Sequence, residues 1–469
     1  MKALIDVTPT AEQLALFSRN GPGVEIIRGA AGSGKTTTAL LKLRSLAAFY
    51  INRARRQDNP DPVNVLVLTY NRTLRGYINE LTQQQLHEEP LIHLEIQTFN
   101  SWARSLARPR FEIMNIETSM QTLRRFSGSM RLEPQFVADE ASYVLSRFLP
   151  EDLDDYLGAR RDGRGIAPRM ERPARQLLLN AVVRPYIDFK KNNRLLDWND
   201  LAVQLAAQHV REYSVIVVDE SQDFSANEVR AVLNQRAEHA STTFVLDSAQ
   251  RIYARNFNWP EVGVAVTSGR SSTLQTNYRN TKQIARFAAA LLEGLALDDN
   301  GTMPNYDSAI SEGEVPFVLT GLYPDQVNFA LRYIQENVDL TQDSVAFLHP
   351  KGWFRGLTPE LDRLKLPWVS LTGTTDWPKG SQNIALCTLH SSKGLEFDHI
   401  IMLGLDGSVV DVRSPDDDVE DYEPSSRFRR LIAMGVGRAR KSVILGFKRN
   451  DAPDIIRYFG DNLYQGVDV

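Results

Sequence analysis

A glycine-rich segment near the amino terminus, RGAAGSGKTTTALLKL at residues 28–43, constrains the fold of this chain more than any other stretch. The apolar residues 24–27 before it predict a short buried strand, and the leucines after it follow a helical spacing. Strand, glycine-rich turn and helix together are the context in which the pattern G-x-x-x-x-G-K-[ST] forms a phosphate-binding loop. The pattern is filled by Gly29, Gly34, Lys35 and Thr36.

Such a loop predicts a nucleotide site. Its backbone N–H groups turn inward as an anion nest, and the amino end of the following helix adds its positive dipole end. We expect the ammonium of Lys35 to reach the β- and γ-phosphates and the hydroxyl of Thr36 to bind Mg²⁺. The residues expected to line the loop are Gly29, Ala30, Ala31, Gly32, Ser33, Gly34, Lys35, Thr36 and Thr37.

Length and composition are those of an ordinary globular protein. With 469 residues, of which 42% are hydrophobic and 24% are charged, the chain has room for about three domains. No apolar run approaches the roughly 20 residues of a membrane span, and the first residues show no signal-peptide pattern, so we expect a cytoplasmic location and no membrane partner. The single cysteine, Cys387, excludes an internal disulfide and a cysteine-rich zinc site.

The net charge of −4 hides two segments of opposite sign. Residues 160–175 carry six arginines against two acids, and residues 411–423 carry seven acids against one arginine. The arginine segment fits either a solvated face or a surface that binds the phosphate backbone of a nucleic acid. The acidic segment predicts a solvated loop.

Two neighbouring carboxylates follow a β-branched segment in the middle of the chain. Residues 215–218 predict a buried strand, and Asp219 and Glu220 stand at its end. We expect the end of this strand to lie beside the phosphate-binding loop. There, Asp219 would hold Mg²⁺ and Glu220 would orient and deprotonate the attacking water.

Further motifs follow in an order that resembles a superfamily 1 helicase of the UvrD/Rep/PcrA type, nearly from end to end. DESQD at residues 219–223 matches the most specific of them. The others are TPTAEQLALF (8–17), the phosphate-binding loop, VLTYNRTLRGYI (67–78), IQTFNSW (96–102), LDSAQRIY (246–253), NYR (277–279), TLHSSKGLEF (388–397) and GRARK, which contains Arg438.

The resemblance implies roles around ATP. Gln13 would read the adenine, Tyr278 would stack on it, and Glu396 would face the ribose. Gln250 would couple the γ-phosphate to the DNA groove. The residues expected to act in catalysis are Lys35, Glu220, Gln250, Arg279 and Arg438.

These residues come from both halves of the chain, which indicates a site between two domains. We therefore expect an α/β fold in which two RecA-like domains with parallel sheets hold ATP and Mg²⁺ between them. Loss of the γ-phosphate would open the cleft. The predicted division is a first motor domain at 1–102 and 214–270, a helical accessory insertion at 103–213 and a second motor domain at 271–469.

The resemblance also places residues beside single-stranded DNA, with some departures from the family. Relatives carry a base-stacking tryptophan where this chain has Arg255, and Trp259 lies close by. Ala433 and Gly437 replace a tyrosine and a threonine, which predicts a weaker or differently built coupling. The residues expected to contact DNA are Tyr70, Asn71, Thr98, Phe99, Arg255, Trp259 and His390.

One piece of the family pattern is missing. Relatives usually carry a large insertion in the second motor domain, before the motif at 388–397. Here only residues 374–382 separate a strand-like segment from that region, too few for an autonomous domain, so we expect a loop or short turn.

Two functions fit these features. The first is an ATP-dependent helicase or translocase that moves 3′→5′ on single-stranded DNA or at a single-strand/duplex junction. The alternative is a DNA-stimulated ATPase switch, or a helicase subunit of a larger repair or anti-phage defence complex, with a nuclease or another protein as partner and little unwinding alone. The sequence leaves the oligomeric state open.

Overall fold

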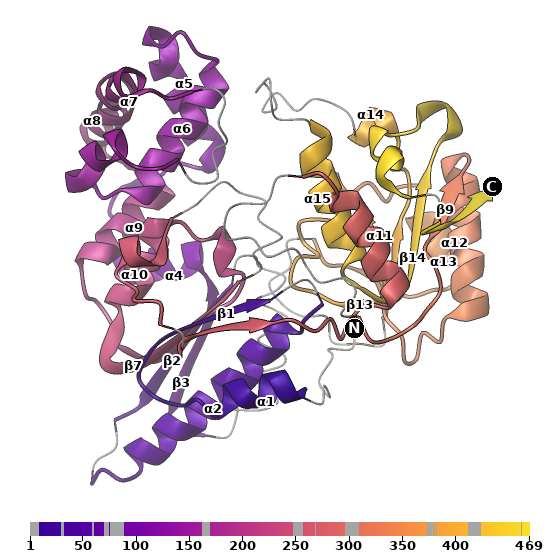
Figure 1. Cartoon of the computed structure of the whole chain (residues 1–469), viewed down its shortest axis with the longest axis horizontal. Coiled ribbons are helices and arrows are strands. Elements are labelled where there is room, and N and C mark those ends of the chain that lie inside the picture. Colours follow the sequence, from indigo (N-terminus) through magenta and orange to yellow (C-terminus); the bar gives the residue numbers. More distant parts are fainter. Residues whose placement is uncertain are drawn as a thin grey trace.

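The computed structural model describes residues 9–29, 32–58, 61–69, 75, 89–161, 169–246, 257–267, 269–295, 309–372, 378, 380, 382–410, 424–460 and 462–469. Their strands form a six-stranded sheet, a seven-stranded sheet and a two-stranded sheet. Figure 1 shows the two large sheets with their helices side by side, and a separate group of helices beyond the first sheet.

The six-stranded sheet has the order β3-β2-β6-β7-β1-β8, and all its described pairings are parallel. Its strands are β1 Gly23–Gly29, β2 Val63–Thr69, β3 Ile92–Thr98, β6 Tyr213–Val218, β7 Arg236–Leu246 and β8 Ser271–Leu274. Helices α1 (Ala11–Phe17) and α2 (Lys35–Ala54) lie on one side, and α4 (Phe99–Ala107), α9 (Trp198–Ala207) and α10 (Ala226–Asn234) on the other. Short 3₁₀ turns follow at Ser221–Asp223 and Trp259–Val262.

The alternation of side chains along β2 explains these two layers. Val65 and Val67 belong to the same buried cluster as Leu43 of α2, whereas Leu66 belongs to the opposite cluster with Trp102 of α4. Because successive residues of a strand point to opposite faces, a strand such as β2 that buries apolar side chains on both faces needs helices on both sides.

Two predicted domain boundaries differ from the extent of the first sheet, in which β7 lies between β6 and β1. The predicted first motor domain stops at residue 270, but β8 pairs with β1 and so extends the sheet. At the other boundary, α9 packs on the first sheet through Leu201 and Leu205, so the helical insertion is shorter than 103–213.

The insertion has a hydrophobic core of its own, built from residues between Met114 and Leu195. The paired strands β4 (Glu112–Ile113) and β5 (Leu195–Leu196) bring its two ends together. Its helices are α5 (Ile116–Phe126), α6 (Pro134–Arg147), α7 (Arg172–Leu178), a π-helical turn (Leu179–Val183) and α8 (Arg184–Asn193), with 3₁₀ turns at Ser127–Ser129 and Pro150–Leu157.

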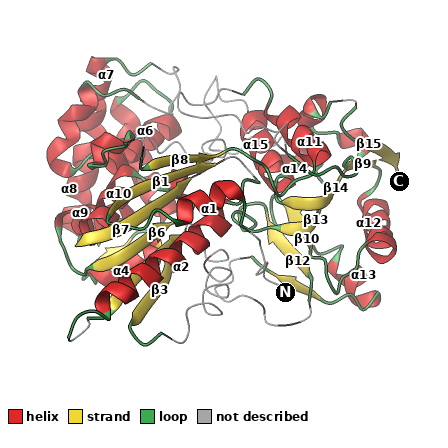
Figure 2. Ribbon diagram, turned by 60° about the horizontal axis from the view of Figure 1, so that its bottom comes forward, coloured by secondary structure: helices red, strands yellow, loops and turns green. Residues whose placement is uncertain are grey.

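The seven-stranded sheet has the order β11-β12-β10-β13-β14-β9-β15, again with parallel pairings (Figure 2). Helices α11 (Lys282–Leu292) and α15 (Pro424–Val436) cover one face, and α12 (Tyr323–Asn337) and α13 (Thr358–Arg363) cover the other. The strands are β9 Phe317–Thr320, β10 Val345–His349, β11 Trp368–Ser370, β12 Ile384–Thr388, β13 Phe397–Met402, β14 Ala439–Phe447 and β15 Gln465–Asp468; α14 is Gly407–Val410, and 3₁₀ turns lie at Arg449–Asp451 and Asp454–Tyr458.

The strands on either side of the predicted 374–382 loop are direct neighbours, since β11 pairs with β12. Most of the loop itself lies outside the described residues. Among the helices that the structure describes, none combines the length and the apolar character needed to cross a membrane.

Candidate nucleotide-binding site

The phosphate-binding loop turns from β1 into α2 through two glycines in the left-handed region. Gly32 has φ +81° and Gly34 has φ +72°. A Cβ atom at Gly32 would lie 2.0 Å from Oδ1 of Asn277, and one at Gly34 would lie 2.6 Å from Nε2 of Gln13. Other residues therefore meet both a strained backbone and a clash at these positions. Two of the predicted loop residues, Ala30 and Ala31, lie outside the described part of the chain.

The first turn of α2 contacts the end of β6, although β7 lies between β6 and β1, the strand that leads into α2. Thr36 Oγ1 donates to Asp219 Oδ2 at 2.9 Å, and the backbone N–H of Asp219 donates to the carbonyl of Leu68 at 2.9 Å. Burial, together with the neighbouring charge of Glu220, raises the pKa of Asp219 to about 6. The half-buried hydroxyl of Thr36 and the buried carboxylate of Asp219 thus meet beside the phosphate-binding loop.

Glu220 lies in an unusual backbone conformation next to this pair. Its φ is +53°, which a non-glycine residue rarely adopts and which recurs at functional sites. Its side chain is buried and accepts a hydrogen bond from Gln222. Burial opposes its ionisation, but the charges of Lys393, Arg438 and Lys35 outweigh burial and lower the pKa of Glu220. The carboxylate is therefore ionised at neutral pH and surrounded by cations from both halves of the chain.

A buried ion pair joins the two large sheets at this point. The ammonium of Lys393 contacts the carboxylate of Asp223 and lies 3.9 Å from Oε2 of Glu220. The side chains of Lys393 and Asp223 are 2% and 0% exposed. Burial opposes the charge of Lys393, yet the two carboxylates outweigh it and raise the pKa of the lysine. The motifs contain both residues, but the sequence assigned neither of them a role.

The short segment 277–280 connects the phosphate-binding loop to the start of β14. The backbone N–H groups of Tyr278 and Arg279 donate to the carbonyl of Gly32 at 3.1 and 3.2 Å. On the other side, Asn280 Nδ2 donates to the carbonyls of Gly437 and Ala439 at 3.2 and 2.6 Å. The sequence did not predict a role for Asn277, the first residue of the NYR motif, or for Asn280, the residue after it, because an asparagine carries no signal of its partners.

Two arginines and a glutamate lie at the second sheet's side of the site. Arg279 forms an ion pair with Glu396 and donates to the carbonyl of Gly437 at 3.3 Å. Burial opposes the ionisation of Glu396, but the charges of Arg279, Arg440 and Arg438 outweigh burial and lower its pKa. Arg438 is 5% exposed, and its charge acts on both Glu220 and Glu396. The charge of Arg438 therefore stabilises the ionised carboxylates of both Glu220, from the first sheet, and Glu396, from the second.

The residues predicted at the adenine differ in their exposure. Gln13 is 2% exposed: its side-chain oxygen accepts from the N–H of Thr10 at 3.0 Å, and its Nε2 donates to the carbonyl of Gly34 at 3.3 Å. Tyr278, in contrast, is 37% exposed. Gln13 therefore contacts the phosphate-binding loop itself, while the ring of Tyr278 is available for stacking.

Several residues predicted to contact DNA have structural partners. Phe99 packs against Trp102 and Phe224, with ring centroids 5.5 and 5.8 Å apart. Trp259 packs against Phe244 at 5.0 Å, at the edge of the core of the first sheet. Thr98 caps α4 by accepting from the N–H of Ser101 at 3.4 Å, whereas His390 is exposed. Tyr70, Asn71, Gln250 and Arg255 lie outside the described residues.

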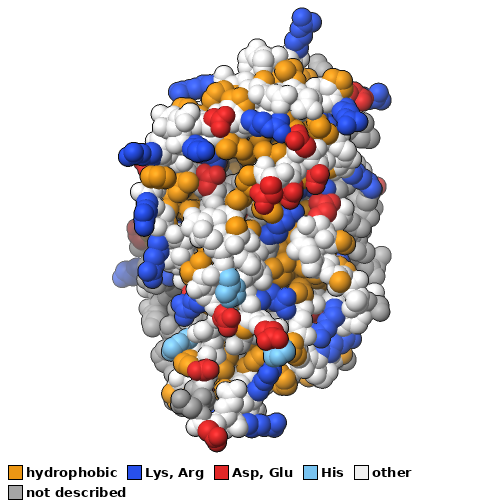
Figure 3. Space-filling model, turned by 90° about the vertical axis from the view of Figure 1, so that its left-hand side faces the viewer, with side chains coloured by type: hydrophobic (Ala, Val, Ile, Leu, Met, Phe, Trp, Pro, Cys, Tyr) orange, Lys and Arg blue, Asp and Glu red, His pale blue; other side chains and the backbone are white. Residues whose placement is uncertain are grey.

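Some side chains of the arginine segment 160–175 form buried or partly buried contacts. Arg161 donates from Nε and Nη2 to the buried carboxylate of Glu140 at 2.7 and 2.8 Å. Arg175 donates to the carbonyls of Met170, Tyr156 and Ala159. In Figure 3 basic and acidic side chains alternate over this side of the molecule. Among the arginines of the segment that the structure describes, Arg160, Arg169 and Arg172 are exposed.

These contacts predict different consequences for two arginines of the segment. Arg161→Met leaves Glu140, which is 0% exposed, without its bidentate partner and should cost about 3–5 kcal/mol in the free energy of unfolding. Arg172→Ala removes an exposed charge and should leave stability within about 0.5 kcal/mol. Denaturant unfolding of both variants measures the difference. Equal stability of the two variants would contradict a structural role for Arg161.

Comparison with known proteins agrees with the motifs. The model of the UvrD/REP helicase N-terminal domain matches residues 10–258, more than half of the chain. A probable DNA helicase of Mycoplasma pneumoniae is 22% identical over 82% of this chain and 73% of its own. DNA helicase IV of Escherichia coli is 22% identical over 92% of this chain and 68% of its own. The C-terminal domain of a possible DNA helicase from Lactobacillus plantarum covers 41% of this chain and 99% of its own with 19% identity, but its TM-score of 0.30 supports no conclusion.

Proposed function

The chain belongs to the UvrD/REP helicase family and is thus an ATP-dependent DNA helicase, and we propose that it moves 3′→5′ on single-stranded DNA by opening and closing the cleft between its two large sheets. The observation that carries this proposal is the meeting of charged residues from both sheets beside the phosphate-binding loop. Asp219, Glu220 and Asp223 come from the first sheet, while Lys393 and Arg438 come from the second.

ATP in this site would touch both sheets. Lys35 and the glycine-rich turn would hold its phosphates, and Arg279 and Arg438 would neutralise the charge that develops on the γ-phosphate during transfer. Arg279 now pairs with Glu396, so nucleotide binding would exchange one partner of this arginine for another. When the γ-phosphate leaves, the contact that closes the cleft is lost, and this exchange provides the stepping motion.

Mg²⁺ fits the pair formed by Thr36 and Asp219. Their oxygens are 2.9 Å apart, with Asp219 buried and Thr36 half-buried, and oxygen ligands of this kind are those that Mg²⁺ prefers alongside phosphates. The ion would neutralise phosphate charge when bound. Glu220, which remains ionised because cations surround it, would accept the proton of the attacking water.

The alternative, a DNA-stimulated ATPase switch in a larger assembly, rests on the altered motif around Arg438. Gly437, where relatives carry a threonine, has no side chain, and its carbonyl accepts from Arg279 and Asn280. At this position, the contact with Arg279 and Asn280 is therefore made by a backbone carbonyl and not by a side chain.

The test is to measure ATP turnover and strand separation on the purified chain. We expect single-stranded DNA to stimulate ATP hydrolysis more than duplex DNA or RNA does. We also expect a duplex with a 3′ single-stranded tail to be unwound in preference to one with a 5′ tail. Stimulated hydrolysis without unwinding of either substrate would favour the ATPase switch, and a preference for the 5′ tail would refute the proposed direction.

A further inference from the structure

Near the start of β14, this strand has one residue more than the neighbouring stretch of β13. Phe397 pairs with Ala439, but two residues later His399 pairs with Ser442. Arg440 and Lys441 therefore lie opposite a single residue of β13. Both are exposed, whereas the residues before and after them are buried. Two consecutive exposed residues in a strand that is otherwise buried mark a β-bulge, which bends the strand and re-aims its side chains.

This bulge lies directly beside the candidate nucleotide site. Arg438 immediately precedes β14, and Glu396 immediately precedes β13. The backbone N–H of Phe397 donates to the carbonyl of Arg438 at 3.0 Å, which is the last contact between the two strands before the bulge. Any change in the register of β14 at the bulge therefore changes where the backbone places Arg438.

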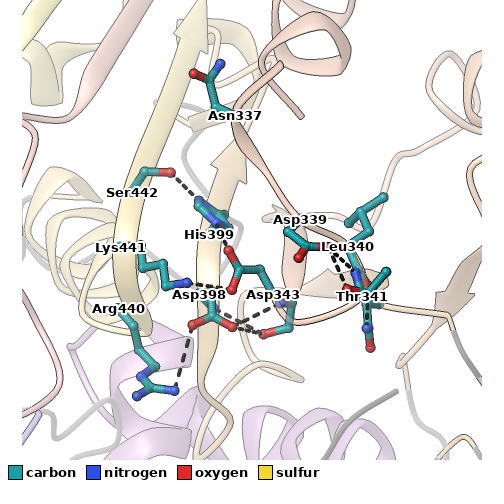
Figure 4. Close-up of polar contacts among 12 residues, drawn as sticks. Asn337, Asp339, Leu340, Thr341, Asp343, Asp398, His399, Arg440, Lys441 and Ser442 are labelled. Carbon is teal, nitrogen blue, oxygen red and sulfur yellow. Dashed lines mark hydrogen bonds and ion pairs between the residues drawn. The ribbon is translucent and has the colours of Figure 1, made fainter. Parts of the chain in front are cut away.

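A buried histidine holds the two strands together just beyond the bulge. His399 Nδ1 lies 2.7 Å from Ser442 Oγ, and its Nε2 lies 3.3 Å from Asp343 Oδ2 (Figure 4). Burial lowers the pKa of His399 although Asp343 and Asp398 oppose the shift. The ring is therefore neutral, with one donor and one acceptor. Since the carboxylate can only accept, Nε2–H donates to Asp343 and Nδ1 accepts from the hydroxyl of Ser442.

The charged groups of the bulge contact one aspartate in the turn before β10 and one in β13. Lys441 Nζ lies 2.5 Å from Asp343 Oδ1, and Arg440 Nη1 lies 3.7 Å from Asp398 Oδ1. Asp398 Oδ2 accepts from the N–H and the hydroxyl of Ser344 at 3.0 and 3.1 Å. Figure 4 shows His399 between Ser442 and Asp343, with both bulge residues directed to the aspartates.

We propose that His399 is a positioning residue for ATP hydrolysis: through Ser442 and Asp343 it fixes the bulge of β14 and so the place of Arg438 in the cleft. The inference rests on the proposed role of Arg438 at the γ-phosphate. A charged group that acts on the transition state must be placed to a fraction of an ångström, and a shift of about 1 Å can cost about 10²-fold in rate.

The experiment measures kcat and KM for ATP at saturating single-stranded DNA in three variants. Ser442→Ala and His399→Phe remove the hydrogen bond, and we expect kcat to fall about 10- to 100-fold while KM for ATP changes little. His399→Asn should recover most of kcat, because its side-chain oxygen can take the place of Nδ1 as acceptor. Ser442→Ala is the smallest change and keeps the test valid if His399→Phe does not fold.

His349 provides a matched control. It is a buried histidine of the same sheet, 4% exposed against 5% for His399, but it lies at the other end of β10, where Nδ1 accepts from the N–H groups of Lys351 and Trp353 at 3.1 and 3.2 Å. His349→Phe should therefore keep a normal kcat.

A double-mutant cycle with Arg438→Ala separates this inference from the proposed function. If Ser442 acts through Arg438, adding Ser442→Ala to Arg438→Ala should cause no further loss of kcat. Wild-type kcat in Ser442→Ala, equal losses in His349→Phe and His399→Phe, or additive losses in the double variant would each overturn the inference. Wild-type kcat in Arg438→Ala alone would instead overturn the proposed role of that arginine.

Discussion

Glu220→Gln is expected to bind ATP normally and to hydrolyse it about 10²–10⁴-fold more slowly, since a positioned base contributes about this factor. The amide keeps the size of the side chain but cannot accept the proton. Binding should survive because Lys35 and the phosphate-binding loop remain. Turnover in the presence of single-stranded DNA and binding of a fluorescent ATP analogue measure the two effects.

Glu228→Gln is the matched control for this change. Glu228 lies in α10, shortly after Glu220, and its carboxylate accepts from the N–H of Ser225 at 2.6 Å as part of a helix cap. The side-chain oxygen of glutamine can still accept this hydrogen bond, so the variant should keep its stability and leave turnover unchanged. Near-normal turnover in Glu220→Gln would show that another group activates the water.

Arg438→Ala is expected to lose about 10³–10⁵-fold in ATP turnover while single-stranded DNA binding survives, because an arginine that neutralises the transferring phosphate contributes about this factor. Arg438→Lys should recover little of the loss, since lysine keeps the charge but not the planar, five-donor group. The measurement is DNA-stimulated turnover together with DNA affinity for both variants.

Arg429→Ala tests whether loss of any buried arginine has this effect. Arg429 lies in α15 and donates to the carbonyl of Leu291 at 2.9 Å, so its role is structural. The variant should lose stability and keep its turnover at a temperature at which it is folded. Wild-type turnover in Arg438→Ala, or an equal loss in Arg429→Ala, would contradict a special place for Arg438.

Local chemistry was predictable from the sequence. The motif that contains Gly34, Lys35 and Thr36 predicted a strand, a glycine-rich turn and a helix. The apolar run 215–218 before Asp219 predicted a buried strand, and the structure has all of these elements. The order of strands in the sheet was not predictable, because consecutive strands of the chain need not be neighbours. The sequence therefore did not show that β7 lies between β6 and β1, although Thr36 beside the phosphate-binding loop contacts Asp219 as expected.

The sequence also could not predict which charged side chains are buried and paired. Arg161 and Arg172 stand in the same arginine-rich segment, yet Arg161 pairs with buried Glu140 and Arg172 is exposed. Lys393 and Asp223 are far apart in the chain and meet only because the two sheets meet. Residue type and spacing carry information over a few turns of helix or strand, whereas these contacts depend on tertiary packing.

A distance measurement can show whether nucleotide sets the separation of the two large sheets. Asn52→Cys on α2 and Gln335→Cys on α12 place spin labels on exposed positions of the two halves. The native Cys387 is buried, and burial raises the pKa of its thiol, so labelling favours the introduced cysteines.

Pulsed electron–electron double resonance then gives the distance between the two spin labels, once with ADP and once with a non-hydrolysable ATP analogue. We predict two distinct distance distributions in the wild-type background, and loss of the ATP-dependent one in Arg438→Ala. The same distribution in both nucleotide states, in a protein that binds both nucleotides, would show that nucleotide does not set the separation of the two sheets.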